Sequence, residues 1–220
     1  MSVYPHRRRR PVLHWAQLAF LALGVALLGY VGYSLLDSTL FQLYEHWRFD
    51  RAVNASRRAP IKEQPGVPLT IDSSPEEVGR ATFTDGSVLG RIEIRRIGVS
   101  VIVMEGTDRR TLQRAVGHIA GTSLPGQPGN IAIAGHRDTF FRELRNLRLG
   151  DEITLTTLDG SLVYEVDSMK VVAADNTAVL NHSTRSDLTL VTCYPFYFVG
   201  PAPRRFVVHA TAKVSTASGR

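Results

Sequence analysis

The single cysteine of the 220-residue chain, Cys193, is the side chain with the clearest capacity for covalent chemistry. It ends an apolar, strand-like run at 187–193, and a loop rich in aromatic residues and proline follows at 194–203. A side chain at the end of a strand, beside a loop, is accessible to other molecules. The alternative is a buried cysteine that acts as a small hydrophobic residue, which is the commoner fate of a free thiol. One thiol also excludes an internal disulfide and a zinc site built from cysteines.

A thiol nucleophile needs a partner that takes its proton, and histidine is the usual one. Of the seven histidines, four lie in the part of the chain that we expect to fold as a domain: His118, His136, His182 and His209. His136 is the best placed, because it follows a strand-like segment and a glycine that allows another backbone to approach closely. His118 lies in a similar glycine-flanked segment and stays an alternative. We expect His209 to be a structural or exposed strand residue and His182 to be solvated in a polar turn.

Acyl transfer also requires positive charge or hydrogen-bond donors near the developing oxyanion. Arg204 and Arg205 open the last strand-like segment, directly after the loop that follows Cys193, so either can return to the neighbourhood of the thiol. The alternative is a pair of solvated surface cations. The sequence contains no His-x-x-x-His pair and no carboxylate cluster with ligand spacing, so we expect neither a metal ion nor another cofactor.

The elements that must position these residues are short segments rich in Val, Ile, Leu and Thr, separated by Gly, Pro, Asp and Asn. They predict strands at 88–94, 99–104, 130–134, 152–157, 162–173, 187–193 and 205–213. Short helices are expected only at 111–116, 139–147 and 176–180. Because long helices between the strands are lacking, we expect a mainly β domain, closed or nearly closed into a barrel, rather than an alternating parallel sheet.

The N-terminal part of the chain predicts a membrane anchor. Residues 13–36 carry no formal charge at neutral pH, and at about 1.5 Å per residue they form roughly 36 Å of helix, enough to cross a bilayer. Four arginines at 7–10 precede this run and Asp37 follows it, which predicts a cytoplasmic N-terminus and an extracytoplasmic domain. A cleavable signal peptide is the alternative, but the apolar run is longer than the apolar region of a normal signal peptide, about 7–15 residues, and no clear A-x-A site follows. An unpaired thiol outside the cytoplasm is open to oxidation, which favours a chemical role for Cys193.

Six regions follow from these patterns. They are a basic cytoplasmic N-terminus at 1–12, a transmembrane anchor at 13–36, a juxtamembrane helix at 37–58, a linker at 59–86, the β domain at 87–214 and a tail at 215–220. Apolar residues at three- and four-residue steps predict that the juxtamembrane helix docks on the lipid surface or on its own domain. The linker contains four prolines and few large apolar residues, a composition typical of an extended tether.

The formal net charge of +6 does not indicate a nucleic-acid partner. Four of these charges come from the arginines at 7–10, which also act as the cytoplasmic flank of the anchor. The remaining chain is close to neutral and offers no basic face of the kind that nucleic-acid binding requires.

Three segments of the chain resemble, in order, the signatures of the sortase family. They are IAGHRDTFF at 133–141, TLVTC at 189–193 and APRRFVV at 202–208, and the match covers most of residues 87–213. The stretch at 117–130 and the CYPF at 193–196 look most like class D sortases. The resemblance implies an eight-stranded sortase-type β-barrel with short helices, preceded by an N-terminal transmembrane helix.

The same resemblance implies a membrane-anchored cysteine transpeptidase that cleaves LPxTG-like sorting signals. Cys193 would attack the carbonyl of the signal's threonine to give a thioacyl enzyme, and His136 would serve as general acid and then general base. Arg205, in preference to Arg204, would bind the substrate backbone and the oxyanion. We expect substrate contacts from Thr192, Tyr194 and Arg204.

The expected partners are proteins that carry such a signal, an amine acceptor that is either a peptidoglycan precursor or a pilin lysine, and the lipid bilayer. An L,D-transpeptidase also pairs Cys and His outside the membrane, but its close-set motif does not occur, since His136 and Cys193 lie far apart in the sequence. The other alternative is a non-catalytic, membrane-anchored β module that scaffolds envelope proteins, in which Cys193 is buried and inert.

Overall fold

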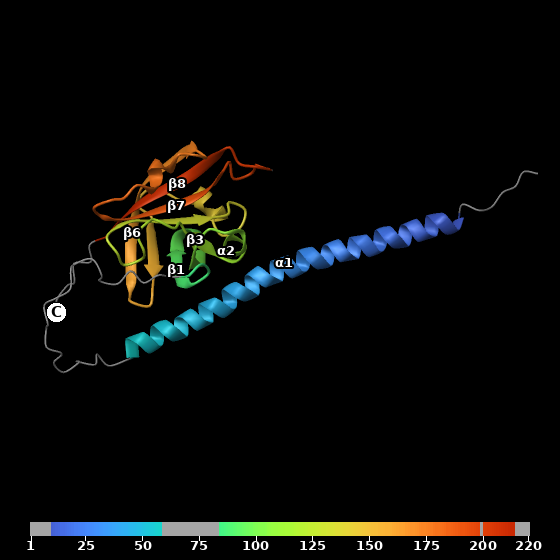
Figure 1. Cartoon of the computed structure of the whole chain (residues 1–220), viewed down its shortest axis with the longest axis horizontal. Coiled ribbons are helices and arrows are strands. Elements are labelled where there is room, and N and C mark those ends of the chain that lie inside the picture. Colours follow the sequence, from blue (N-terminus) through green and yellow to red (C-terminus); the bar gives the residue numbers. More distant parts are fainter. Residues whose placement is uncertain (1–9, 59–83, 199, 214–220) are drawn as a thin grey trace, which may run out of the picture. The chain divides into compact units, whose positions relative to one another are not determined.

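The computed structural model of the chain describes residues 10–58, 84–198 and 200–213, and the structural statements below refer to these residues (Figure 1). The chain forms two compact units that meet between Phe41 and Gln42. One long helix, α1 (Arg10–Arg58), runs through this boundary, and the strands lie in the second unit. The predicted linker, at 59–86, lies mostly outside the described residues.

Within the first unit, α1 contains a segment long and apolar enough to cross a membrane, Leu13–Tyr33. This finding rests on length and composition, and it agrees with the predicted N-terminal anchor. The side chains of this segment are mostly exposed in the isolated chain, as expected for a helix whose natural surroundings are lipid.

Eight strands form a closed barrel in the order β1-β2-β3-β4-β7-β8-β6-β5. The pairs β2–β3 and β4–β7 are parallel, and the other neighbours are antiparallel. Closure leaves no unpaired sheet edge, so the backbone hydrogen bonds of each strand have partners on both sides. The strands are β1 Val88–Ile94, β2 Val99–Glu105, β3 Val116–His118, β4 Gly129–Gly135, β5 Glu152–Thr156, β6 Ser161–Ala173, β7 Ser186–Tyr194 and β8 Arg204–Ala212.

The short helices lie in the connections between strands. They are η1 Arg95–Ile97, α2 Arg109–Arg114, η2 Arg142–Asn146 and η3 Thr177–Leu180, and the three labelled η are 3-10 helices. Asp108 caps α2, because its carboxylate accepts hydrogen bonds from the backbone N–H groups of the first turn. The helix predicted at 139–147 is shorter in the structure, where only η2 forms in this segment.

The structure confirms the mainly β barrel but adds β3, a strand that the sequence pattern does not reveal. This strand has three residues, and its middle residue is Gly117, which carries no side chain to signal burial. A Cβ atom at Gly117 would collide with the carbonyl oxygen of Gly106, so the close approach of these two backbones requires glycine here. The predicted helix at 111–116 ends at Arg114, which leaves Val116 to start β3.

The barrel interior is filled by aliphatic side chains from all parts of the sheet. Ile92, Leu155, Leu188 and Leu190 have no exposed surface, and Phe141 from the segment before η2 joins the same cluster. Each such side chain stabilises the fold by about 1.5–3 kcal/mol through removal of apolar surface from water. The barrel is thus a solid scaffold, and reactive side chains must lie on its outer face or at its strand ends.

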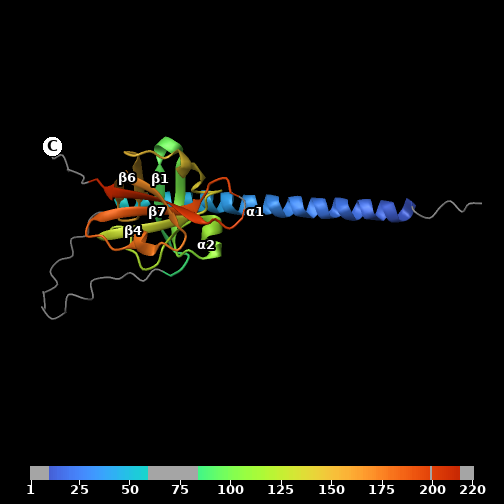
Figure 2. The same ribbon diagram turned by 90° about the horizontal axis from the view of Figure 1, so that it is seen from above.

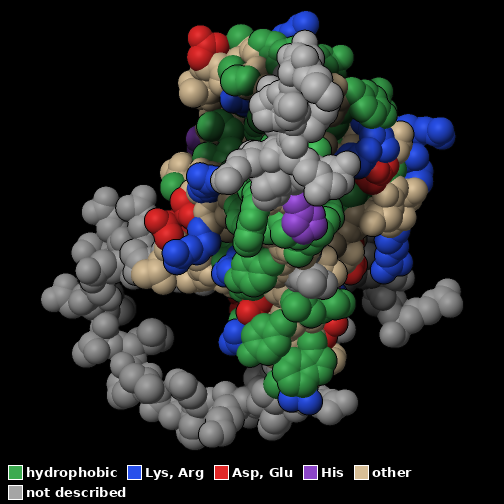
Figure 3. All heavy atoms as spheres, turned by 90° about the vertical axis from the view of Figure 1, so that its right-hand side faces the viewer, with side chains coloured by type: hydrophobic (Ala, Val, Ile, Leu, Met, Phe, Trp, Pro, Cys, Tyr) green, Lys and Arg blue, Asp and Glu red, His purple; other side chains and the backbone are tan. Residues whose placement is uncertain are grey.

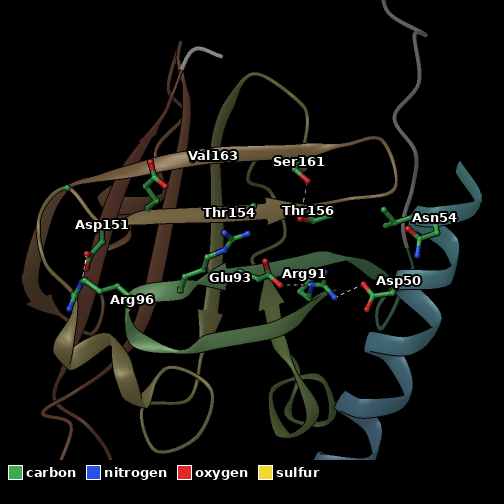
Figure 4. Close-up of a pocket in the computed structure, with 14 residues that line it drawn as sticks. Asp50, Asn54, Arg91, Glu93, Arg96, Asp151, Thr154, Thr156, Ser161 and Val163 are labelled. Carbon is green, nitrogen blue, oxygen red and sulfur yellow. Dashed lines mark hydrogen bonds and ion pairs between the residues drawn. The ribbon is translucent and has the colours of Figure 1, made fainter. Parts of the chain in front are cut away.

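The second part of α1, from Gln42 onwards, packs against β1 and β2. The Gln42 side-chain amide donates to the carbonyl of Arg114 at 2.6 Å, and its oxygen accepts from the N–H of Ile102 at 3.2 Å. Phe49 is only 5% exposed, and Asp50 pairs with Arg91 of β1 at 2.7 Å (Figure 4). This segment of the helix is therefore part of the barrel unit.

Candidate active site

Cys193 lies opposite Arg205 across the antiparallel pair β7–β8. These strands lie side by side (Figure 1). Residues directly opposite each other in such a pair point to the same face of the sheet, with Cβ atoms about 4.5–5.5 Å apart. Cys193 is partly exposed, and Arg205 is its cross-strand neighbour. It is not the fully buried hydrophobic cysteine of the alternative interpretation.

His136 approaches Cys193 from the other side of β7. Strands β4 and β7 run parallel, as Figure 2 shows, and their register ends with Gly135 beside Thr192. The next residue along each strand is His136 on β4 and Cys193 on β7, so the two lie at the same level of neighbouring strand ends. The sequence separates them by 57 residues, and the parallel pairing brings them together.

The backbone at His136 is fixed by its neighbours. The Thr192 hydroxyl donates to the carbonyl of Gly135 at 2.7 Å, and the N–H of Phe141 donates to the carbonyl of His136 at 3.0 Å. A Cβ atom at Gly135 would lie 2.6 Å from the Phe141 ring, so only glycine allows this ring to close over the end of β4. Thr192, expected to touch substrate, is instead buried, with its hydroxyl bound to the strand that carries the histidine.

The register distinguishes the two arginines that open β8. Arg204 lies opposite Tyr194 and Arg205 opposite Cys193, so by strand alternation Arg204 and Arg205 face different sides of the sheet. The Arg204 guanidinium lies 5.8 Å from the centre of the Tyr194 ring, a cation-π contact. The Nη1 atom of Arg205 donates to the carbonyls of Ala202 and Arg204, at 3.2 and 3.1 Å, which leaves its other N–H groups available.

The end of β7 and the loop that follows it carry a row of aromatic rings. Tyr194 packs edge-on against Phe196 with ring centres 6.0 Å apart, and Phe196 packs in the same way on Phe206 at 5.4 Å. Beyond them, Tyr197 is 79% exposed and Phe198 45% exposed. Figure 3 is seen from the right-hand side of Figure 1, where this loop lies, and shows hydrophobic side chains beside arginine and lysine side chains.

The other histidines of the domain lie apart from Cys193. His118 is 2% exposed in β3, where Nδ1 lies 2.8 Å from a Glu105 carboxylate oxygen and Nε2 lies 3.0 Å from the Ser123 carbonyl oxygen. Both ring nitrogens thus have partners inside the protein, and β4 separates β3 from β7. His209 lies along β8 with Asp167 at 3.5 Å, and His182 is exposed between η3 and β7.

Sequence reasoning missed one residue of this region, Arg137. Its guanidinium donates to the carbonyl of Pro195 at 3.1 Å and to the carbonyl of Gly200 at 2.9 Å, and it lies 5.8 Å from the centre of the Phe198 ring. The only signal in the sequence is its position directly after His136.

A separate cavity of about 700 Å³ lies on the opposite wall of the barrel. It is lined by polar and charged side chains of α1, β1 and β5, among them Asp50, Arg91, Glu93 and Thr154 (Figure 4). In the ring of eight strands, β1 is four strands away from β7 in either direction, so this cavity does not adjoin Cys193. Within the part of the chain that the structure describes, no group of three or more His, Cys, Asp and Glu side chains is arranged to hold a metal ion.

Comparison with known proteins connects this chain to a family. The family model described as "Sortase domain" matches residues 92–213. Sortase D of Bacillus subtilis is 31% identical over 195 residues, which cover 87% of this chain and 94% of the relative. The chain is also similar to Sortase SrtE1 of Streptomyces coelicolor, 32% identical over 52% of this chain and 38% of the relative.

Solved structures agree with these sequence matches. A Clostridium perfringens Sortase D5 transpeptidase superposes with a TM-score of 0.55 at 33% identity, over 60% of this chain and 82% of that one. A sortase C of Clostridium perfringens, solved with the C-terminal cell wall sorting motif, gives 0.55 at 32% identity, over 60% and 74% of the two chains. These matches confirm the resemblance that the motifs indicated, including its class D character. The chain, with its barrel and its single cysteine between a histidine and an arginine, belongs to the sortase family of cysteine transpeptidases.

Proposed function

We propose that this sortase cleaves LPxTG-like sorting signals and transfers the protein that carries them to an amine of the cell envelope, with Cys193, His136 and Arg205 as the catalytic residues. The observation that carries the proposal is the position of Cys193 between the other two, at the ends of three adjacent strands. A related sortase C solved with the C-terminal cell wall sorting motif supports the class of substrate.

In the first half of the proposed reaction, the Cys193 thiolate attacks the carbonyl carbon of the signal's threonine. The Arg205 guanidinium donates hydrogen bonds to the oxyanion that forms, where a preorganised cation stabilises developing charge more strongly than it would in water. The C–N bond then breaks, and His136 gives a proton to the leaving amine. The products are a thioester on Cys193 and the released C-terminal piece of the signal.

In the second half, a primary amine of the acceptor attacks the thioester carbonyl. His136 takes the proton of the incoming amine, and the C–S bond breaks to restore the Cys193 thiolate. One amide bond has been exchanged for another, so the reaction balances without an energy source or a cofactor. A peptidoglycan precursor and a pilin lysine both offer the required primary amine.

The proposal places the reaction at the outer surface of the membrane. The apolar segment Leu13–Tyr33 of α1 would anchor the protein, and the arginines at 7–10 would keep the N-terminus in the cytoplasm. A substrate held at the same membrane would then meet the enzyme at high local concentration, since both are confined to one surface.

Tyr194 and Arg204 are the proposed substrate contacts of the loop that follows Cys193, since both lie at the exposed end of β7 and β8. Thr192 contributes indirectly, because its hydroxyl holds Gly135 and thereby the strand end that carries His136.

Intact-mass spectrometry of residues 42–220, incubated with an LPxTG-type peptide, tests the proposal. We expect the mass to rise by the N-terminal portion of the peptide, to return when an amine is added, and to stay constant in Cys193→Ala. The matched substrate control is a peptide in which the threonine carbonyl is replaced by a methylene group, so that the thiolate has no carbonyl carbon to attack. A wild-type protein that forms no adduct across a varied peptide set, while its thiol reacts with iodoacetamide, would overturn the proposal.

A further inference from the structure

Arg137 joins the strand that carries His136 to the loop that follows Cys193. One guanidinium nitrogen donates to the carbonyl of Pro195 at 3.1 Å and another to the carbonyl of Gly200 at 2.9 Å. The first acceptor lies two residues after the thiol and the second lies near the far end of the same loop. A single side chain thus fixes two separate points of the loop between β7 and β8.

The chemistry of the contact suits a rigid connection. A guanidinium is planar, and its N–H groups diverge at fixed angles, so two hydrogen bonds define the direction of both carbonyls. Phe198 adds a third point, with its ring centre 5.8 Å from the guanidinium carbon, and the Arg137 side chain is partly buried. By contrast, Tyr197 and Phe198 leave large parts of their rings exposed, so apolar packing alone holds this half of the loop weakly.

We propose that Arg137 is a positioning residue that holds the loop between β7 and β8 against the end of β4 and thereby sets the surface on which the peptide substrate lies. The part of this inference that concerns substrate rests on the proposed function. Because both terminal nitrogens of the Arg137 guanidinium donate to carbonyls of the loop, we assign its effect to the position of the loop and not to the reacting atoms.

Loss of this connection should affect binding more than chemistry. In Arg137→Ala we expect KM for an LPxTG-type peptide to rise about tenfold, while kcat changes by less than about threefold. The pH profile of Cys193 alkylation by iodoacetamide should stay unchanged, since the thiol and its neighbours Arg205 and His136 remain in place. Arg137→Lys should recover only part of the loss, because one ammonium group cannot reach both carbonyls.

The loop itself offers a readout that needs no substrate. Chymotrypsin cuts after aromatic residues, so the rate of limited proteolysis at Tyr197 and Phe198 reports how firmly the loop is held. We expect Arg137→Ala to be cut about tenfold faster than the wild type at these two positions. Arg96→Ala is the matched control, because Arg96 also connects two segments, through Asp151 and the carbonyl of Asn146, but on the other side of the barrel.

The outcomes separate this inference from the proposed function. Faster cutting of Arg137→Ala supports the loop contact even where the wild type fails to form an acyl enzyme, a failure that would overturn the proposed function alone. An active wild type with unchanged KM and unchanged cutting in Arg137→Ala would refute the inference. Equal losses in Arg96→Ala would show a general loss of stability, and a shifted alkylation profile with full recovery in Arg137→Lys would show a direct charge effect on the thiol. Either result also refutes it.

Discussion

Removal of the helical segment 42–58 should destabilise the barrel although this segment precedes the family domain. Two fragments make the comparison, one that begins at residue 42 and one that begins at residue 59. The shorter fragment loses Phe49, whose burial stabilises the fold by about 1.5–3 kcal/mol. It also loses the two hydrogen bonds of Gln42, worth about 0.5–1.5 kcal/mol each.

The net effect is smaller than these contributions, because the longer fragment must order the helix against the barrel. We expect a loss of about 3 kcal/mol in the free energy of unfolding, which corresponds to a fall in Tm of roughly 10 °C for a domain of this size. Thermal unfolding followed by circular dichroism measures the difference. Acylation by a peptide at 20 °C should persist in both fragments, since Cys193 lies on the opposite wall of the barrel.

Point variants in the longer fragment show whether the packed face of the helix causes the effect. Phe49→Ala should lower the free energy of unfolding by about 2 kcal/mol, the contribution expected from burial of its ring. Leu43→Ala, on the same helix but 63% exposed, should change it by less than about 0.5 kcal/mol. Equal Tm values for the two fragments, or equal effects of the two substitutions, would refute the reasoning.

Other expectations concern the proposed catalytic residues and the ionisable groups of the barrel. His136→Ala should reduce turnover by about 10²–10⁴-fold. His118→Ala should act mainly on stability, because it leaves the buried Glu105 carboxylate without its partner. Turnover rates of the two variants, compared at equal concentrations of folded protein, distinguish the two effects. Burial, with a smaller contribution from the Asp187 carboxylate, raises the pKa of Tyr164 to about 12. The folded state therefore resists ionisation of this hydroxyl, so the contribution to stability is complete below pH 10 and is lost as the pH rises towards 12. About 3 kcal/mol should therefore be lost between pH 10 and 12, and Tyr164→Phe should abolish this loss in urea titrations at several pH values. The hydrogen bond from Arg96 lowers the pKa of Asp151, so its contribution is present above the ordinary carboxyl pKa and is lost as the pH falls through the lowered value. Asp151→Asn should cost about 2 kcal/mol at pH 7 and flatten the acid limb of the same titration.

The nature of the fold followed from local patterns because most strands are long enough to show them. The runs that became β1, β6 and β7 each contain several β-branched or aromatic residues, and turn residues bound them. Strand β3 escaped detection because three residues around Gly117 carry no period, and its place is determined by pairing with distant strands. Tertiary contacts also convert most of the predicted helix at 139–147 into the shorter η2.

The sequence predicts which residues belong to the candidate site, but not how they are arranged in space. Residue types identified Cys193 and made His136 the best of four histidines, yet only the parallel register of β4 and β7 puts these two side by side. The resemblance favoured Arg205 over Arg204, and the register adds the physical difference between them, since Arg205 and not Arg204 lies opposite Cys193. The role of Arg137 depends on carbonyl groups 58 and 63 residues away, which leave no trace in the side-chain sequence.

The parallel pairing of β4 with β7, and the antiparallel pairing of β7 with β8, have a consequence for how such an enzyme can change over evolution. The ladder of the sheet, about 4.7–4.9 Å per strand, sets the spacing among the three strands that carry the proposed catalytic residues. The proposed substrate contacts Tyr194 and Arg204 flank the connecting loop at 195–203, and this loop can accept insertions and substitutions without altering that ladder. Recognition and reactivity are in this sense separate modules. An engineer seeking a new sorting signal could exchange the loop as a cassette, provided that its carbonyls still meet Arg137.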